Sequence, residues 1–116
     1  VLIMPLIGVI NTDRGALLTG ALLAAIEQQH ARIVILDVTG VPIIDERIAR
    51  VLLESAQAAR LLGAQVVLTG LRPELAETII SLGLNLAGLI VRADLQSGVA
   101  YALKQRTIDS RLINRS

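Results

Sequence analysis

Short runs rich in β-branched residues alternate along this chain with longer stretches of helical periodicity, and this alternation restricts the fold most strongly. The runs predicted as strands are residues 1–7, 32–36, 65–69 and 89–91. The stretches predicted as helices are residues 11–29, 45–62, 73–83 and a last one that Asp94 caps. Strands and helices that alternate and are joined by short loops imply a largely parallel sheet with right-handed crossovers. The sequence therefore predicts one α/β domain, in which Pro5 favours an edge position or a bulge for the first strand.

Composition excludes several classes of function. The 116 residues suit one domain with one core, and no apolar run approaches the roughly 18 residues of a membrane span. Disulfides and cysteine metal sites are excluded because the chain has no cysteine, and we expect a cytoplasmic protein. Nucleic-acid binding is not favoured. The net charge is only +1, which gives little attraction to phosphates, and one tyrosine with no Phe or Trp gives little surface for base stacking. Because Val1 already lies in a predicted strand, we expect the sequence to be part of a longer protein.

The most informative stretch joins the second predicted strand to the second predicted helix. Asp37 to Pro42 is predicted as a loop, and Asp45 stands where a helix N-cap belongs. Glu46 follows this cap, at the positive end of the helix and beside unpaired backbone N–H groups. A hydroxyl at that position could carry a phosphate whose charge a docked protein would sense. This chain has a carboxylate there instead.

Catalytic and ligand sites are weakly supported. Asp37 and Asp45 could form a carboxylate pair, but the one histidine, His30, lies at the far end of a predicted helix, so an N-cap role suits Asp45 better. Asp37 is expected to fix its loop by accepting hydrogen bonds from nearby N–H groups, and it could also face a partner. Thr39 and Thr69 lie at strand ends, where doubly wound sheets form ligand crevices. We expect Thr69 to cap the next helix, or else to be a modified or ligand-binding hydroxyl.

Three segments together resemble a known family. They are DVTGVPIID at 37–45, LTGLRPE at 68–74 and VRADLQSGVAYAL at 91–103. In their order and spacing they resemble the STAS domain (sulfate transporter and anti-sigma factor antagonist), most closely the RsbR-type co-antagonists of the bacterial stressosome, with the RsbS scaffold a near relative. The resemblance implies a SpoIIAA-like fold with helices mainly on one face of a mostly parallel sheet. It also implies a STAS domain at 1–103 that lacks most of its first strand, and a C-terminal tail at 104–116.

The resemblance further implies a non-enzymatic regulatory domain that is controlled by phosphorylation and needs no cofactor or metal. An RsbT-like Ser/Thr kinase would bind near the start of the second helix and modify a Ser or Thr directly after the Asp there. Other STAS domains are also implied as partners, in a homo- or hetero-oligomer, with no nucleic acid or membrane partner. A second phosphorylatable Thr is expected in the third helix, where Thr78 is the nearest candidate, and Thr69 is a further one. The residues expected to form the partner-binding loop are Asp37, Thr39, Gly40, Asp45, Arg47 and Arg50.

Glu46 departs from the family pattern, since a carboxylate replaces the hydroxyl. It is either a permanent partial phosphomimetic or a first-turn acid that stabilises its helix by about 0.3–1 kcal/mol. Two other functions remain open: a small-ligand-binding STAS domain that uses the strand-end crevice, and the cytosolic STAS domain of an anion transporter. The LTGLRPE segment argues against the transporter.

Overall fold

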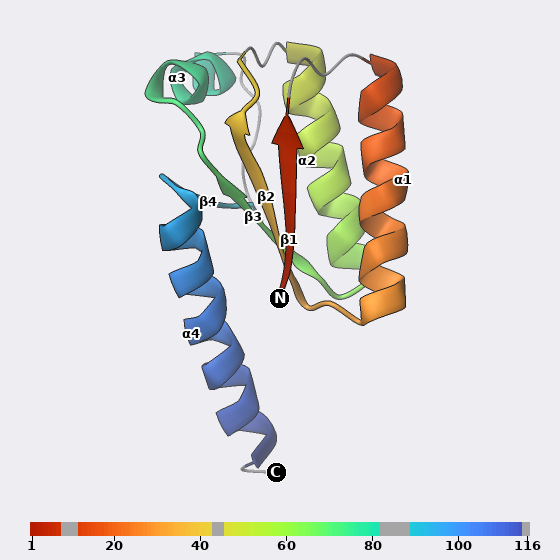
Figure 1. Cartoon of the computed structure of the whole chain (residues 1–116), viewed down its shortest axis with the longest axis vertical. Helices are drawn as coiled ribbons and strands as arrows, with labels where there is room; N and C mark the ends of the chain where they lie inside the picture. Colours follow the sequence, from red (N-terminus) through yellow and green to blue (C-terminus); the bar gives the residue numbers. More distant parts are fainter. Residues whose placement is uncertain (8–11, 43–45, 82–88, 115–116) are drawn as a thin grey trace.

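A computed structural model describes residues 1–7, 12–42, 46–81 and 89–114 as strands and helices that alternate from end to end (Figure 1). The strands are β1 (Leu2–Ile7), β2 (Ile33–Gly40), β3 (Gln65–Thr69) and β4 (Ile90–Arg92). The helices are α1 (Thr12–Gln29), α2 (Glu46–Leu61), α3 (Pro73–Ser81) and α4 (Leu95–Asn114). The predicted number, type and order of elements are confirmed.

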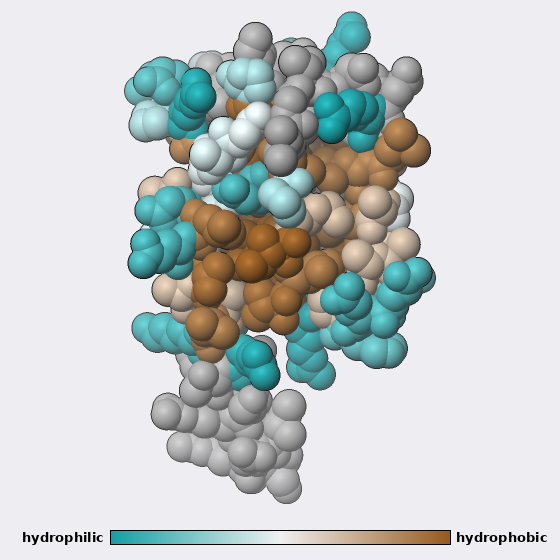
Figure 2. All heavy atoms as spheres, viewed as in Figure 1, coloured by the Kyte–Doolittle hydropathy of each residue, from teal (hydrophilic) through white to brown (hydrophobic). Residues whose placement is uncertain are grey.

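The sheet is parallel, in the order β1-β2-β3-β4, which confirms the predicted α/β class. Among the described residues β1 forms one edge, and Pro5 sits beside a register shift in its pairing with β2. Both expectations for Pro5, an edge and a bulge, are therefore met. Ile3 of β1 is half exposed, and Figure 2 shows apolar side chains gathered over the middle of the face on which β1 lies in front.

Two apolar layers form because successive side chains of a strand point to opposite faces of the sheet. Val34, Leu36 and Val38 of β2 belong to the larger cluster, which α1 and α2 cover. Ile33 and Ile35 belong to a smaller cluster with Ala102 of α4. The expectation of helices mainly on one face describes α1 and α2, whereas α4 packs on the opposite face (Figure 1).

The second strand is longer than predicted. The sequence predicts a loop from Asp37 onward, but β2 continues to Gly40. The reason lies in the neighbouring strands: Asp37 pairs with Pro5 of β1 and with Thr69 of β3, and Gly40 pairs with Ile7 of β1. Asp37 therefore lies within the sheet rather than in a free loop.

Helix ends follow local signals in most places. Gly63 ends α2 with φ +83°, as predicted, and Asp94 Oδ1 accepts a hydrogen bond from Ser97 N (2.7 Å) to cap α4. His30, expected as a polar helix end, adopts φ 50°, which is rare for a residue other than glycine. Helix α4 continues through the predicted tail to Asn114 and runs past the sheet (Figure 1). The predicted N-cap Asp45 lies outside the described residues.

Candidate protein-binding site at the carboxyl end of the sheet

The carboxyl ends of β2 and β3 bring together side chains that are far apart in the sequence. Asp37 Oδ1 accepts hydrogen bonds from Thr39 Oγ1 (2.8 Å) and from Thr69 Oγ1 (2.9 Å). Asp37 fixes this segment as predicted, but the donors of these two bonds are hydroxyls and not the backbone N–H groups expected. The two bonds tie the exposed rim at Thr39 to the buried end of β3.

Gly70 closes this cluster and has no room for a side chain. Its φ is +79°, and a Cβ atom built on it would overlap Thr39 Oγ1 and lie 2.9 Å from Asp37 Oδ1. Two features therefore require a glycine here: the left-handed backbone conformation and the close approach of the end of β2. The Thr-Gly pairs at 39–40 and 69–70 end the two strands in similar ways, but only the second glycine has a positive φ.

Thr69 is a core residue. Its side chain is fully buried, its hydroxyl donates to Asp37, and its methyl group lies where a Cβ on Gly98 of α4 would be. The hydroxyl is thus buried and engaged within the domain instead of capping the next helix. The expectation that Thr69 caps the next helix is wrong, because its hydroxyl binds Asp37 and its side chain joins β2, β3 and α4. Its role as a modified or ligand-binding hydroxyl stays a prediction.

Glu46 is the first residue of α2, and its side chain is 48% exposed. Its Oε1 accepts a 2.8 Å charge-assisted hydrogen bond from Arg50 Nη2, one helical turn later. Such exposed i, i+4 pairs contribute about 0.3–0.5 kcal/mol. Glu46 and Arg50 were expected on one binding surface but not as a pair, although their i, i+4 spacing is a usable signal for one. Arg47 is also exposed on this surface.

The backbone of Thr78 is part of α3, as predicted, but the position of its side chain is not described. His30 lies at the end of α1, remote from the carboxyl edge of the sheet. Among the residues with described side chains, no three of the types His, Cys, Asp or Glu gather to hold a metal ion. Within the same residues, every buried side-chain N or O atom has a hydrogen-bond partner. None of the described helices combines the length and apolar character needed to cross a bilayer.

Two cavities in the described structure lie at the amino ends of β2 and β3 instead of at their carboxyl ends. One measures about 380 Å³ and is lined in part by Arg32, Arg60 and Gln65; the other measures about 620 Å³ and lies between the ends of α1 and α2. Neither is the strand-end crevice that the sequence suggested for a small ligand. The carboxyl end presents an exposed helix start beside a rigid polar edge, an arrangement suited to contact with another macromolecule.

The structure is that of a small α/β domain with an ordered polar edge at the carboxyl end of a parallel sheet. The family model of the STAS domain matches residues 1–97, and the chain belongs to that family. It is 38% identical over 102 residues to RsbT co-antagonist protein RsbRA of Bacillus subtilis, an alignment that covers 88% of this chain and 37% of RsbRA. The chain thus spans little more than a third of this relative.

Solved structures agree with the assignment. A serine-to-glutamate variant of RsbS from Moorella thermoacetica superposes with a TM-score of 0.76 and 27% identity, covering 90% of this chain and 89% of RsbS. A chain in a structure of the stressosome, described as a signal integration and transduction hub, gives a TM-score of 0.71 and 26% identity, with coverage of 88% and 92%. The predicted resemblance to RsbR-type and RsbS proteins is confirmed, and the STAS domain is a regulatory rather than a catalytic family.

Proposed function

We propose that this domain is the regulatory STAS module of an RsbR-type co-antagonist, that it binds an RsbT-like kinase through the carboxyl end of its sheet, and that it assembles with other STAS domains. The observation that carries the proposal is Glu46: an exposed acid opens α2 at the position where the family places its phosphorylatable hydroxyl. The similarity to RsbRA, an RsbT co-antagonist by name, supports the kinase as partner. The similarity to a stressosome chain supports the assembly.

The site has a rigid frame and a changeable surface. Asp37, Thr69 and Gly70 are fixed by hydrogen bonds and by close packing, so the edge keeps one shape. Beside it, Glu46 and Arg47 are exposed and accessible to a partner, with Glu46 also paired to Arg50. A partner that recognises the charge at the start of α2 would therefore bind a surface that is already ordered. This lowers the entropic cost of binding.

Glu46 supplies one negative charge where a phosphate would supply about 1.5 to 2, and Arg50 partly neutralises it. It acts as a weak, permanent form of the phosphorylated signal. Phosphate-dependent control then falls on Thr78 of α3, because residues 43–49 contain no hydroxyl.

Titration with RsbT from Bacillus subtilis tests the binding surface. Arg47→Glu reverses one exposed charge beside Glu46 and should weaken binding at least tenfold, about 1.4 kcal/mol. Arg106→Glu reverses an equally exposed charge on α4 and should leave the affinity within about twofold. Equal affinities for both variants, or no binding by the wild type, would overturn the proposed surface.

Treatment with the kinase and ATP tests the modification. Mass spectrometry should find one phosphate, on Thr78, and Thr78→Val should abolish it. Phosphate on another residue, or none with a kinase that modifies a control substrate, would remove Thr78 from the proposal.

A further inference from the structure

The helices α1 and α2 both end beside a cavity of about 620 Å³ at the amino end of the sheet. The apolar part of its lining consists of Ile26, Ala31 and Leu62. Ile26 is 2% exposed and belongs to the larger core cluster, so the floor of the cavity is continuous with the core. The volume lies within the range of about 300–1,000 Å³ that is usual for small-molecule sites.

Three ionisable side chains line the same cavity: Glu27, His30 and Arg32. All three have described side chains, and no ion pair or hydrogen bond joins any two of them. A carboxylate and a guanidinium that share one cavity without neutralising each other can each bind a ligand group of opposite charge. The cavity therefore combines one anionic and one cationic binding group with an apolar floor.

The two helix ends favour a ligand cation near Glu27. Because α1 ends at Gln29 and α2 at Leu61, both helix dipoles place their negative ends beside the cavity. His30, which follows α1 directly, adopts φ 50°, and residues held in such sparsely populated conformations cluster at ligand sites. An ammonium group is the ligand cation that suits a carboxylate next to two helix carboxyl ends.

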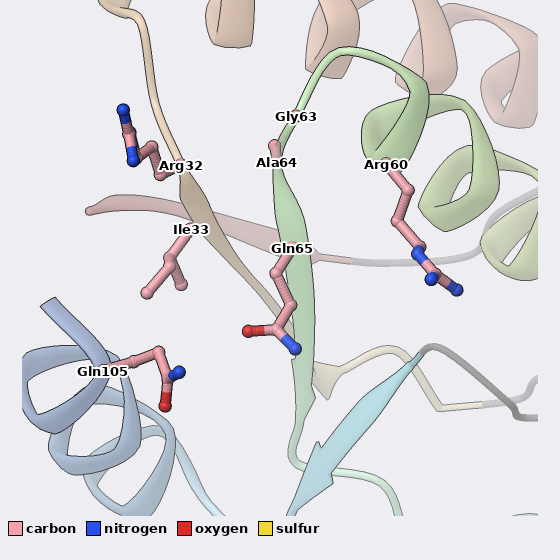
Figure 3. Close-up of a pocket in the computed structure, with 7 residues that line it drawn as sticks. All are labelled: Arg32, Ile33, Arg60, Gly63, Ala64, Gln65 and Gln105. Carbon is pink, nitrogen blue, oxygen red and sulfur yellow. The ribbon is translucent and has the colours of Figure 1, made fainter. Parts of the chain in front are cut away.

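The walls of the cavity are ordered by backbone hydrogen bonds. Ala31 N donates to Ile26 O (3.2 Å), and Gln65 N donates to Arg32 O (2.8 Å). Figure 3 shows the adjoining cavity of about 380 Å³, which is also lined by Arg32, and there the Arg32 side chain extends away from Gln65 and Arg60. Its guanidinium is thus not directed at the polar groups of the smaller cavity, and the larger cavity is formed before a ligand arrives.

We propose that this cavity binds an apolar α-amino acid, with its ammonium group on Glu27, its carboxylate on Arg32 and its side chain against Ile26 and Leu62. A ligand with both charges and an apolar body is the class that uses all three parts of the lining. The site goes beyond the proposed function. It lies at the amino end of the sheet, opposite the proposed kinase surface.

Titration of the whole chain with L-leucine, followed by NMR of backbone amides, tests the site. Leucine should shift the amides of His30 and Gly63 in a saturable way, with a dissociation constant of about 1 mM or lower. The amide of Gly70, at the other end of the sheet, should not move. No saturable shift at His30 and Gly63 up to about 20 mM leucine, or an equal shift at Gly70, overturns the proposal.

Three analogues of leucine each lack one recognised group. L-Leucinamide lacks the carboxylate, 4-methylpentanoate lacks the ammonium group, and glycine lacks the apolar side chain. Each should bind at least about fivefold more weakly than leucine, because one part of the lining is then left without a partner. An analogue that binds as tightly as leucine contradicts the corresponding contact and with it the amino-acid class.

Two variants assign the charges. Glu27→Gln should raise the dissociation constant of leucine at least about fivefold and leave that of 4-methylpentanoate within about twofold. Arg32→Gln should weaken leucine equally and leave L-leucinamide within about twofold.

The matched controls are Glu54→Gln and Arg106→Gln, which change an exposed acid on α2 and an exposed arginine on α4, neither of which lines the cavity. Both controls should leave the binding of every ligand within about twofold. If Glu27→Gln and Arg32→Gln weaken all ligands alike, or no more than the controls do, the proposed contacts are wrong.

Discussion

At the carboxyl end of the sheet, Asp37, Thr39 and Thr69 bond to one another and Gly70 packs against them, whereas at the amino end Leu61 and Arg60 project into solvent. The first region satisfies its polar groups within the domain, so its shape depends on each member. The second region leaves both of these side chains exposed to solvent. Substitutions should therefore cost more stability at the carboxyl end than at the amino end.

The sharpest comparison uses one glycine from each end. Both Gly70 and Gly63 have a positive φ, but a Cβ on Gly63 would have no neighbour within 4 Å, whereas one on Gly70 would overlap Thr39. Gly63→Ala should cost about 1 kcal/mol from backbone strain alone, and Gly70→Ala about 2–4 kcal/mol. Urea denaturation of both variants measures the difference. Equal costs would mean that the carboxyl end can relax and is not the rigid frame inferred here.

The next effect concerns the buried hydroxyl. Thr69→Val keeps the shape of the side chain but removes the donor to Asp37, and should cost about 1–2 kcal/mol. Thr39→Val removes the other donor at an exposed position, where water can replace it, and should cost about 0.5 kcal/mol or less. Denaturation midpoints of the two variants check the order. A larger loss of stability for Thr39→Val would mean that the exposed Thr39–Asp37 bond stabilises the fold more than the buried Thr69–Asp37 bond.

Features set by neighbours in the sequence were the predictable ones. The bounds of β3, the start of α3 at Pro73, the glycine after α2 and the cap at Asp94 follow from local pattern, and each agrees with the structure. The length of β2 was not predictable, because its last residues extend through pairing with β1 and β3. Local signals suffice where the cause lies within about four residues.

The sites divide in the same way. The acid that opens α2, Glu46, was predictable from its position directly after the predicted N-cap. The bond between Asp37 and Thr69 joins residues 32 positions apart, and only the parallel register of β2 and β3 brings them together. The difference between Leu61 and Leu62 is local, because helical spacing puts Leu62 on the stripe that contains the buried Ala59. Leu61 is 88% exposed and Leu62 is 42% exposed.

A third prediction addresses the charge at the start of α2. Glu46→Ser should restore a modifiable hydroxyl and strengthen binding of RsbT to the unmodified chain, because it removes a negative charge from the docking surface. Stability should fall by a few tenths to about 1 kcal/mol, from the lost helix-dipole interaction and the lost pair with Arg50. Glu54→Ser, at an exposed acid further along α2, is the control for both readouts. An unchanged kinase affinity, within about twofold, would reduce Glu46 to a first-turn acid.

The smallest effect is expected at Asp94, which caps α4 near the carboxyl edge. Hydrogen bonds from the backbone N–H and the side chain of Ser97 hold the pKa of Asp94 below its usual range. A carboxyl with a lowered folded-state pKa stabilises the fold above the pKa of the unfolded chain, and this contribution is lost as the pH falls through the folded-state value. Asp94→Asn keeps a capping oxygen but cannot ionise. The wild type should therefore melt slightly higher than Asp94→Asn at neutral pH, and the two should converge in acid, as melting curves across that range can measure. A difference that persists in acid would show that the ionised carboxylate is not its source.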